Sequence, residues 1–215
     1  VLIERMLKLF AKNAGLESYF PKAAVTYRFL RDQRLKKRWQ MFPTPLGFDM
    51  IESEGHADSR LESGEMPLFF DLLKTTDVFV DVGANFGVFT LAARLQGIKC
   101  LAIEPDPANL DALLANLQHN NFSDVEVFPL ALSRKAGLLP LFGGGEGASL
   151  VKNWGGMTNT YSRLVPINTL DNLVSWRFPR EELFIKVDVE GHEFDVLQGA
   201  IRLLDRVPAP VWLIE

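Results

Sequence analysis

The sequence contains little cysteine, no long apolar run and little net charge, and each shortage excludes a class of protein. Cys100 is the single cysteine among 215 residues, so no disulfide can form within the chain and no Cys/His zinc-site spacing occurs. No uninterrupted apolar run approaches the ~20 residues that span a bilayer, and the first residues lack the order of a signal peptide. We therefore expect a soluble, cytoplasmic protein, and we assign no metal ligands.

The rest of the composition is that of a globular chain. Hydrophobic residues make up 47% and charged residues 23% of the sequence, and sixteen residues are Phe. These fractions exclude an intrinsically disordered chain, a collagen-like fibre and a disulfide-rich miniprotein. The length fits one large domain, or one domain with an added terminal segment.

Charge is distributed unevenly along the chain. Residues 1–40 contain ten Lys or Arg and three acidic residues, a net charge of +7, which leaves −11 for residues 41–215 because the total is −4. We expect residues 1–45 to form a basic helical segment and linker, and residues 46–215 to form the main domain. The basic segment is expected either to pack on that domain or to contact an anionic partner or a membrane surface.

From about residue 65, short apolar runs alternate with helical periods, which indicates an α/β architecture with crossover helices and a mostly parallel sheet. Strands are expected at residues 78–82, 99–104, 125–128, 183–187 and 211–214. Helices are expected at residues 86–96, after Asp106 and Pro107, and between the last two strands. The apolar positions expected to face the core on the second and third helices are Leu110, Leu113, Leu114, Leu117, Phe194, Leu197, Ile201 and Leu204. Residues 133–182 are the least regular part.

A glycine-containing turn follows the first of these strands. It runs Asp81-Val-Gly-Ala-Asn-Phe-Gly87, and Glu104 ends the next strand. Glycines allow close backbone approach to a ligand, and an acidic residue about twenty positions later is the spacing that places a carboxylate on a ribose hydroxyl pair. The pattern predicts a nucleoside cofactor.

The same turn narrows the choice of nucleoside. Asn85 occupies the place of the middle glycine, so the dinucleotide fingerprint is incomplete, and no Gly-Lys-Ser or Gly-Lys-Thr follows, which excludes a P-loop. Asp81 suits a ligand with a positive ammonium group, such as the methionine end of S-adenosylmethionine.

Further segments carry a resemblance to a known family. Together with the turn, Ile103-Glu-Pro-Asp106, Ala131-Leu-Ser133, Thr169-Leu-Asp-Asn-Leu173 and Ile185-Lys-Val-Asp-Val-Glu-Gly191 resemble the FkbM family of S-adenosylmethionine-dependent methyltransferases, from about Glu65 to Glu215. The resemblance implies a Rossmann-like class I methyltransferase fold with helices on both faces of the sheet. It also implies methyl transfer, usually to a hydroxyl of a sugar, glycan, polyketide or similar small metabolite.

The resemblance also implies roles for individual residues at the cofactor. It puts Gly83, Asn85, Phe86 and Gly87 around the methionine part and Glu104 on the ribose. Asp106 would lie near the adenine edge, unless it is only a helix cap. The adenine ring would be flanked by Ala131 and Leu132, for which plain packing is the alternative.

The acceptor chemistry is expected just past the fourth strand, where ligands sit in open parallel sheets. We expect Asp188 to lie nearest the methyl group, with Glu190 or His192 assisting as base. The alternatives are a helix-terminal role for Glu190, a structural role for His192, and a metal held by Asp188 and Glu190. Lys186 is expected to point away from Asp188 and to pair with a helix carboxylate.

The irregular insertion is a candidate lid over the acceptor. Its glycines give mobility and its aromatic residues can stack on a sugar or an apolar ring. Ser149, Trp154 and Tyr161 are the residues expected to contact the acceptor, and an ordinary surface hairpin is the alternative.

Three rival functions stay open at this point. An NAD-type oxidoreductase shares the fold but requires the missing glycine. A non-catalytic binding or scaffolding domain would keep only the fold or pocket. A nucleic-acid methyltransferase is disfavoured because the acidic main domain would repel phosphates. A class I sheet normally continues past a fifth strand, so we expect further strands or a second copy of the chain at that edge.

Overall fold

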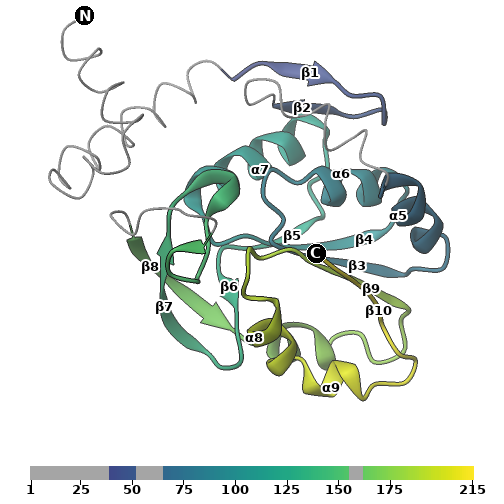
Figure 1. Ribbon diagram of the computed structural model, residues 1–215. Coiled ribbons are helices and arrows are strands. Elements are labelled where there is room, and N and C mark those ends of the chain that lie inside the picture. Colours follow the sequence, from purple (N-terminus) through teal and green to yellow (C-terminus); the bar gives the residue numbers. More distant parts are fainter. Residues whose placement is uncertain (1–38, 52–64, 155–161) are drawn as a thin grey trace, which may run out of the picture.

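The structure, a computed structural model, describes residues 39–51, 65–154 and 162–215. Its centre is a five-stranded sheet in which every neighbouring pair of strands is parallel (Figure 1). The strand order is β10-β9-β3-β4-β5. The strands are β3 (Val78–Val82), β4 (Lys99–Ile103), β5 (Glu126–Phe128), β9 (Leu183–Val187) and β10 (Val211–Ile214).

The chain reverses its direction of travel across the sheet between β3 and β9. It runs outward from β3 through β4 to β5, and then returns to place β9 on the other side of β3. In open parallel sheets the carboxyl ends of the strands leave a crevice at such a point. The fold therefore puts the turn after β3 beside the segment after β9, as the α/β prediction requires.

Helices cover both faces of this sheet (Figure 1). On one face, α5 (Met66–Leu73), α6 (Val88–Leu95) and α7 (Pro107–His119) pack over an aromatic cluster in which Phe69, Phe79 and Phe184 have ring centroids 5.2 to 5.5 Å apart. On the other face, the helical turn η3 (Asp171–Ser175), α8 (Glu193–Gln198) and α9 (Ile201–Leu204) pack on alternate strand residues such as Val80 and Ile185. The expected two-sided fold class is confirmed.

Helix α7 begins as the sequence predicts, but its buried face is different. The Asp106 carboxylate accepts hydrogen bonds from the backbone N–H groups of Ala108 and Asn109, which are donors that a helix start leaves unpaired. Leu113 and Leu117 are buried as expected, whereas Leu114 is 46% exposed. Asn109 and Asn116 occupy the buried face in its place.

The expected single apolar face between β9 and β10 is wrong. Phe194, Ile201 and Leu204 are exposed, and the buried side chains are Val196, Ala200 and Leu203. These buried residues keep the i, i+4, i+7 spacing of one helical face, but that face lies one residue before the expected Leu197, Ile201 and Leu204. Gly199 lies on the buried side between α8 and α9, where an added Cβ would be 2.3 Å from the Ser133 carbonyl oxygen.

The insertion between β5 and β9 is more regular than expected. It forms a second sheet of order β6-β8-β7, with β6 (Ala131–Leu132), β7 (Gly137–Phe142) and β8 (Ser162–Asn168). Its inward face buries Ala131, Leu141, Val165 and Ile167, and a short helical turn, η1 (Gly145–Gly147), follows β7. This sheet stands beside the carboxyl ends of the central strands (Figure 1).

A small hairpin precedes the main sheet. Strands β1 (Met41–Pro43) and β2 (Asp49–Ile51) pair across a turn that contains the expected boundary between residues 45 and 46. The Asn116 side chain of α7 accepts a 2.8 Å hydrogen bond from the Ile51 backbone N–H. Most of the expected helical segment, residues 1–38, lies outside the described residues. Within the described ranges, no helix is both long and apolar enough to cross a membrane.

Candidate active site

A pocket opens at the carboxyl ends of β3, β4 and β9, against the small sheet. Its empty space is about 600 Å³, including the open mouth. The residues that line it are Val82, Gly83, Asn85, Ile103, Glu104, Pro105, Asn109, Ala131, Leu132, Leu141, Gly145, Ala148, Leu150, Asp188, Val189, Glu190 and His192.

The turn after β3 forms one wall of this pocket. Gly83 has a φ of +85°, and an added Cβ would lie 1.8 Å from the Asp188 carbonyl oxygen. The backbone N–H groups of Gly83 and Ala84 both donate to the Ile103 carbonyl. Glycine is required at this position because the turn combines a left-handed conformation with contact between two backbones.

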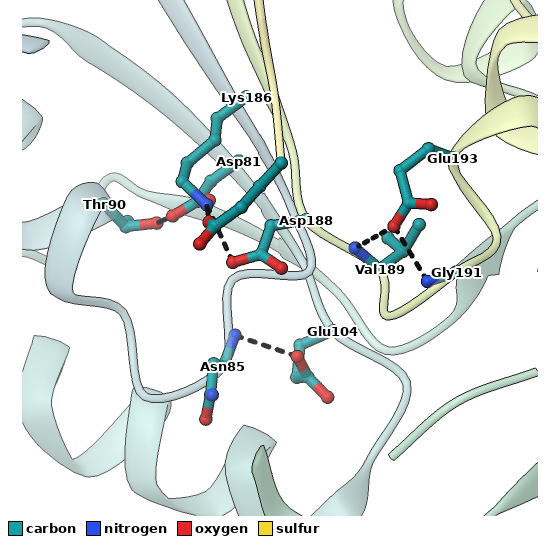
Figure 2. Close-up of polar contacts among 10 residues, drawn as sticks. Asp81, Asn85, Thr90, Glu104, Lys186, Asp188, Val189, Gly191 and Glu193 are labelled. Atoms are coloured by element: carbon teal, nitrogen blue, oxygen red, sulfur yellow. Dashed lines mark hydrogen bonds and ion pairs between the residues drawn. The ribbon is translucent and has the colours of Figure 1, made fainter. Parts of the chain in front are cut away.

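Glu104 lies at the base of the pocket and is 4% exposed. Its Oε2 accepts a 2.8 Å hydrogen bond from the Asn85 backbone N–H (Figure 2), and its Oε1 accepts one of 2.8 Å from the Asp106 N–H. Burial raises the pKa of Glu104 to about 7, although these hydrogen bonds oppose the rise. The carboxylate is thus fixed in position and poised to accept further donors.

Two asparagines beside Glu104 offer oxygen atoms. Asn109 Nδ2 donates to Glu104 Oε1 at 3.3 Å and to the Gly145 carbonyl at 3.1 Å. The side-chain oxygens of Asn85 and Asn109 are buried, and neither accepts a hydrogen bond within the described part of the chain. Buried acceptors without donors are uncommon in folded proteins, so these two fit a ligand that supplies hydroxyl or amino donors.

Other residues expected at the cofactor stand behind the pocket wall. Asp81 is 1% exposed and accepts a 2.6 Å hydrogen bond from Thr90 Oγ1 (Figure 2), so its carboxylate is turned toward α6. Burial raises the pKa of Asp81 to about 6. Asp106 caps α7, and Gly87 begins α6 at a φ of +91°. The Phe86 carbonyl accepts a hydrogen bond from Asn116.

Asp188 also lines the pocket and is paired with a buried cation. Lys186 Nζ lies 2.8 Å from Asp188 Oδ2 and 3.2 Å from Glu215 Oε2, and the Lys186 side chain is 2% exposed (Figure 2). The expectation that Lys186 points away from Asp188 is wrong, because residues two apart on a strand share a face. Burial lowers the pKa of Lys186, but the surrounding carboxylates outweigh it and hold the pKa above its usual value.

The insertion is attached to the loop after β9 through Glu190. Trp154 Nε1 donates a 2.8 Å hydrogen bond to Glu190 Oε2, and Ser149 Oγ donates one of 2.7 Å to the Glu190 carbonyl. The indole also packs so closely on Gly191 that an added Cβ there would lie 2.4 Å from the ring. Ser149 and Trp154 therefore contact the pocket wall and do not line the pocket. Tyr161 lies outside the described residues.

His192 lines the pocket with both ring nitrogens near protein partners. Its Nε2 is 3.0 Å from Ser133 Oγ, and its Nδ1 is 3.6 Å from Asp195 Oδ2. Burial lowers the pKa of His192 despite the neighbouring carboxylates. We find no group of three His, Cys, Asp or Glu side chains in the described ranges that could hold a metal ion.

Sequence reasoning identified about half of the pocket wall. The expected residues that line the pocket are Gly83, Asn85, Glu104, Ala131, Leu132, Asp188, Glu190 and His192. It missed Val82, which ends an expected strand, and Ile103, which lies one residue before the end of another, so strand ends were the available signal. It also missed Asn109 and the insertion residues Leu141 and Leu150, whose place depends on the small sheet.

Residues 81–215 match the family described as the Methyltransferase FkbM domain. The chain belongs to this family. Its cofactor is therefore S-adenosylmethionine. The glycine turn and Glu104 predicted a nucleoside, and Asp81 and the family resemblance predicted this methyl donor. The buried carboxylate and the two amide oxygens without donors fit that cofactor, because its ribose and adenine carry hydroxyl and amino donors.

Individual relatives point in the same direction. This chain is 32% identical over 158 residues to hexuronic acid methyltransferase AglP of Haloferax volcanii, and the match covers 70% of this chain and 61% of AglP. It is 40% identical over 72 residues to methyltransferase sdnD of Sordaria araneosa, which covers 32% of this chain and 28% of sdnD. The chain thus spans less than two thirds of either relative.

Among solved structures, Pyrococcus horikoshii TYW2 in complex with MeSAdo is similar, with a TM-score of 0.35 and 18% identity. That likeness covers 43% of this chain and 36% of the TYW2 chain.

Proposed function

We propose that this FkbM domain is an O-methyltransferase that acts on a hydroxyl group of a sugar, glycan, polyketide or similar small metabolite. The observation that carries the proposal is the placement of two carboxylates in one pocket, each following one of the two strands, β4 and β9, that flank β3. Glu104 lies on the cofactor side, and Asp188 lies across the switch point of the sheet. AglP, by its name a hexuronic acid methyltransferase, supports a sugar as the acceptor class.

On the cofactor side, the walls supply both polar and apolar contacts. The Glu104 carboxylate would accept the ribose hydroxyls, and Asn85 and Asn109 would accept further donors through their buried oxygens. Ala131 and Leu132 would flank the adenine, together with Leu141, Ala148 and Leu150 from the insertion. The roles proposed for Asp81, Phe86, Gly87 and Asp106 are indirect, because these residues shape the turn from behind the wall.

On the acceptor side, Asp188 is the proposed general base. S-adenosylmethionine supplies a methyl group that is already activated by the sulfonium, so the protein has to align an oxygen and take its proton. Asp188 is one-third exposed at the pocket, and the buried Lys186 ammonium, 2.8 Å from Asp188 Oδ2, holds its carboxylate in place.

The remaining acceptor-side residues have structural tasks in the same proposal. Glu190 is held by Trp154 and Ser149, and His192 is held by Ser133. We propose that these contacts fix the wall against which the acceptor lies, and that Tyr161 completes it.

The proposal also covers the partners and the cellular location of the protein. We propose that the +7 charge of residues 1–40 serves contact with an anionic partner or a membrane surface, and that the protein is cytoplasmic. Because the sequence has one cysteine, Cys100, and so no disulfide within the chain, we propose a reducing compartment. A second copy of the chain is a proposed partner at β10, an edge of the central sheet.

Substitution of the proposed base tests the function. Asp188→Asn should reduce methyl transfer from labelled S-adenosylmethionine to a panel of hydroxylated sugars and polyketides by about a hundredfold or more, while affinity for S-adenosylhomocysteine changes much less. Glu182→Gln is the matched control, because Glu182 is exposed at the amino end of β9, away from the pocket. Normal turnover in Asp188→Asn would remove Asp188 from the chemistry.

A further inference from the structure

The charged side chains that line the pocket are all acidic. Glu104, Asp188 and Glu190 line it, and none of the described lining residues is Lys or Arg. His192 adds no positive charge at neutral pH, because burial lowers its pKa from an ordinary value of 6.5. The interior of the pocket therefore carries negative charge that no Lys or Arg among its described lining residues balances.

Among the described residues, Lys186, Arg163 and Arg134 lie near pocket-lining residues, and each is paired with a carboxylate. Lys186 lies behind Asp188 and contacts both Asp188 and Glu215 (Figure 2), so this cluster has more carboxylates than ammonium groups. Arg163 of β8 lies 3.8 Å from the buried Asp106 carboxylate. None of these cations reverses the sign of the field inside the pocket.

We propose that the carboxylates of Asp188 and Glu190 make this pocket selective for a cationic ligand, so that it binds the sulfonium form of the cofactor more tightly than the uncharged thioether product. The inference rests on the proposed function and assigns a task to two residues of the same site. A negative field inside a cleft with low-dielectric walls acts strongly on a single charge.

The charge difference follows from the reaction itself. Methyl transfer breaks the S–CH₃ bond, its electron pair returns to sulfur, and a bond forms between the methyl carbon and the acceptor oxygen. The hydroxyl proton passes to the base, and S-adenosylhomocysteine remains with a neutral sulfur. The donor therefore differs from the product by one methyl group and one positive charge, and a pocket that prefers the cation favours release of the product.

Calorimetric titration of the full chain measures this preference without an acceptor. The ligands are S-adenosylmethionine, S-adenosylhomocysteine and sinefungin, which carries an amine at the position of the sulfonium and is a cation. The titrations are done at low salt and pH 8, above the pKa of about 7 of Glu104. We expect S-adenosylmethionine and sinefungin each to bind with an affinity about tenfold or more above that of S-adenosylhomocysteine. One charge in a site of intermediate dielectric can supply such a ratio.

Variants assign the preference to particular residues. Glu190→Gln and Asp188→Asn should each lower the affinity ratio of cation to neutral ligand several-fold, and 0.5 M salt should lower it less than it would for a surface pair. Glu182→Gln should leave the ratio unchanged, because Glu182 lies at the opposite end of β9 from the pocket.

The possible results separate the inference from the proposed function. Equal affinities for the three ligands, or a ratio that neither pocket variant changes, would overturn the charge selectivity and leave the methyltransferase pocket in place. Binding of none of the three ligands would overturn both.

Discussion

At the residue scale, Glu104 combines deep burial with three hydrogen-bond donors. The donors are the backbone N–H groups of Asn85 and Asp106 and the side-chain amide of Asn109. Burial is the larger effect, so the pKa rises from 4.5 to about 7. The folded protein therefore keeps a proton between about pH 4.5 and 7 that the unfolded chain has released, and the contribution of this group to stability falls as the pH rises through that window.

Glu104→Gln should remove this pH dependence. We expect the free energy of unfolding of the variant, relative to the parent, to rise by on the order of 3 kcal/mol between pH 5 and pH 8. Urea denaturation at several pH values measures the difference, with Glu182→Gln as the control that should show no trend. A pH-independent difference in Glu104→Gln would show that the carboxyl is ionised throughout.

Lys186 is a second residue whose role follows from burial. Its ammonium lies among the Asp188, Glu215 and Asp81 carboxylates and 4.6 Å from the centroid of the Phe89 ring. Removing one partner of a buried ion pair leaves an uncompensated charge, which costs more than the pair contributes.

Lys186→Met should therefore destabilise the fold by about 3 kcal/mol at pH 7, and the loss should shrink at acidic pH as the carboxylates become neutral. Thermal and chemical denaturation measure it, with Lys135→Met as a control because Lys135 is exposed. Equal stability of Lys186→Met and the control would show that water already solvates these carboxylates.

At the element scale, the turn between β3 and α6 is fixed by contact with the segment after β9. Gly83 and Gly97 both have a φ above +80°, but an added Cβ at Gly83 would lie 1.8 Å from a backbone oxygen, whereas one at Gly97 would meet nothing within 4 Å. Substitution of Gly97 therefore measures the cost in stability of a left-handed backbone conformation alone, whereas substitution of Gly83 adds the cost of a clash with the neighbouring backbone.

Gly83→Ala should accordingly lose about 2 kcal/mol or more of stability beyond Gly97→Ala. The comparison uses urea denaturation of both variants under the same conditions. If the two variants lose the same amount, the close approach of the turn to Asp188 is not part of the folded state in solution.

The strands show which elements a sequence can predict. Every residue of β3 and β9 is buried, and all are apolar except Asp81 and Lys186. The bounds of both strands agree with the expectation. Strand β7 contains Pro140 and strand β8 contains Pro166. Proline argues against a strand in the sequence, yet these two strands pair with each other in the structure. The expected helix face between β9 and β10 is wrong for a different reason, because the buried face is one residue out of register with the expected one: Val196, Ala200 and Leu203 are buried in place of Leu197, Ile201 and Leu204.

The pocket residues also divide into those that the sequence can predict and those that it cannot. Asn85, Glu104 and Asp188 follow the carboxyl ends of buried strands, and such positions meet at one edge of a parallel sheet whatever the loops do. Leu141, Ala148 and Leu150 line the pocket only because the small sheet folds over it, and no local pattern predicts that. The pairing of Lys186 with Asp188 was within reach of the sequence, since side chains two apart on a strand lie on one face.

At the scale of the whole molecule, the fold brings two sheets together around one pocket. The central sheet supplies the polar residues at its strand ends, and the small sheet supplies an apolar wall and the contacts that hold Glu190. The division matches a nucleoside ligand, which has polar hydroxyls and an apolar ring face. The central claim is therefore that this pocket binds the cofactor of a methyltransferase.

Calorimetric titration of the purified chain with S-adenosylhomocysteine, with NAD as the control ligand, tests that claim most directly. The account predicts saturable binding of S-adenosylhomocysteine at one site and no binding of NAD, because Asn85 replaces the glycine that close approach of a pyrophosphate requires. Binding of NAD in preference to S-adenosylhomocysteine, or binding of neither ligand, would contradict it.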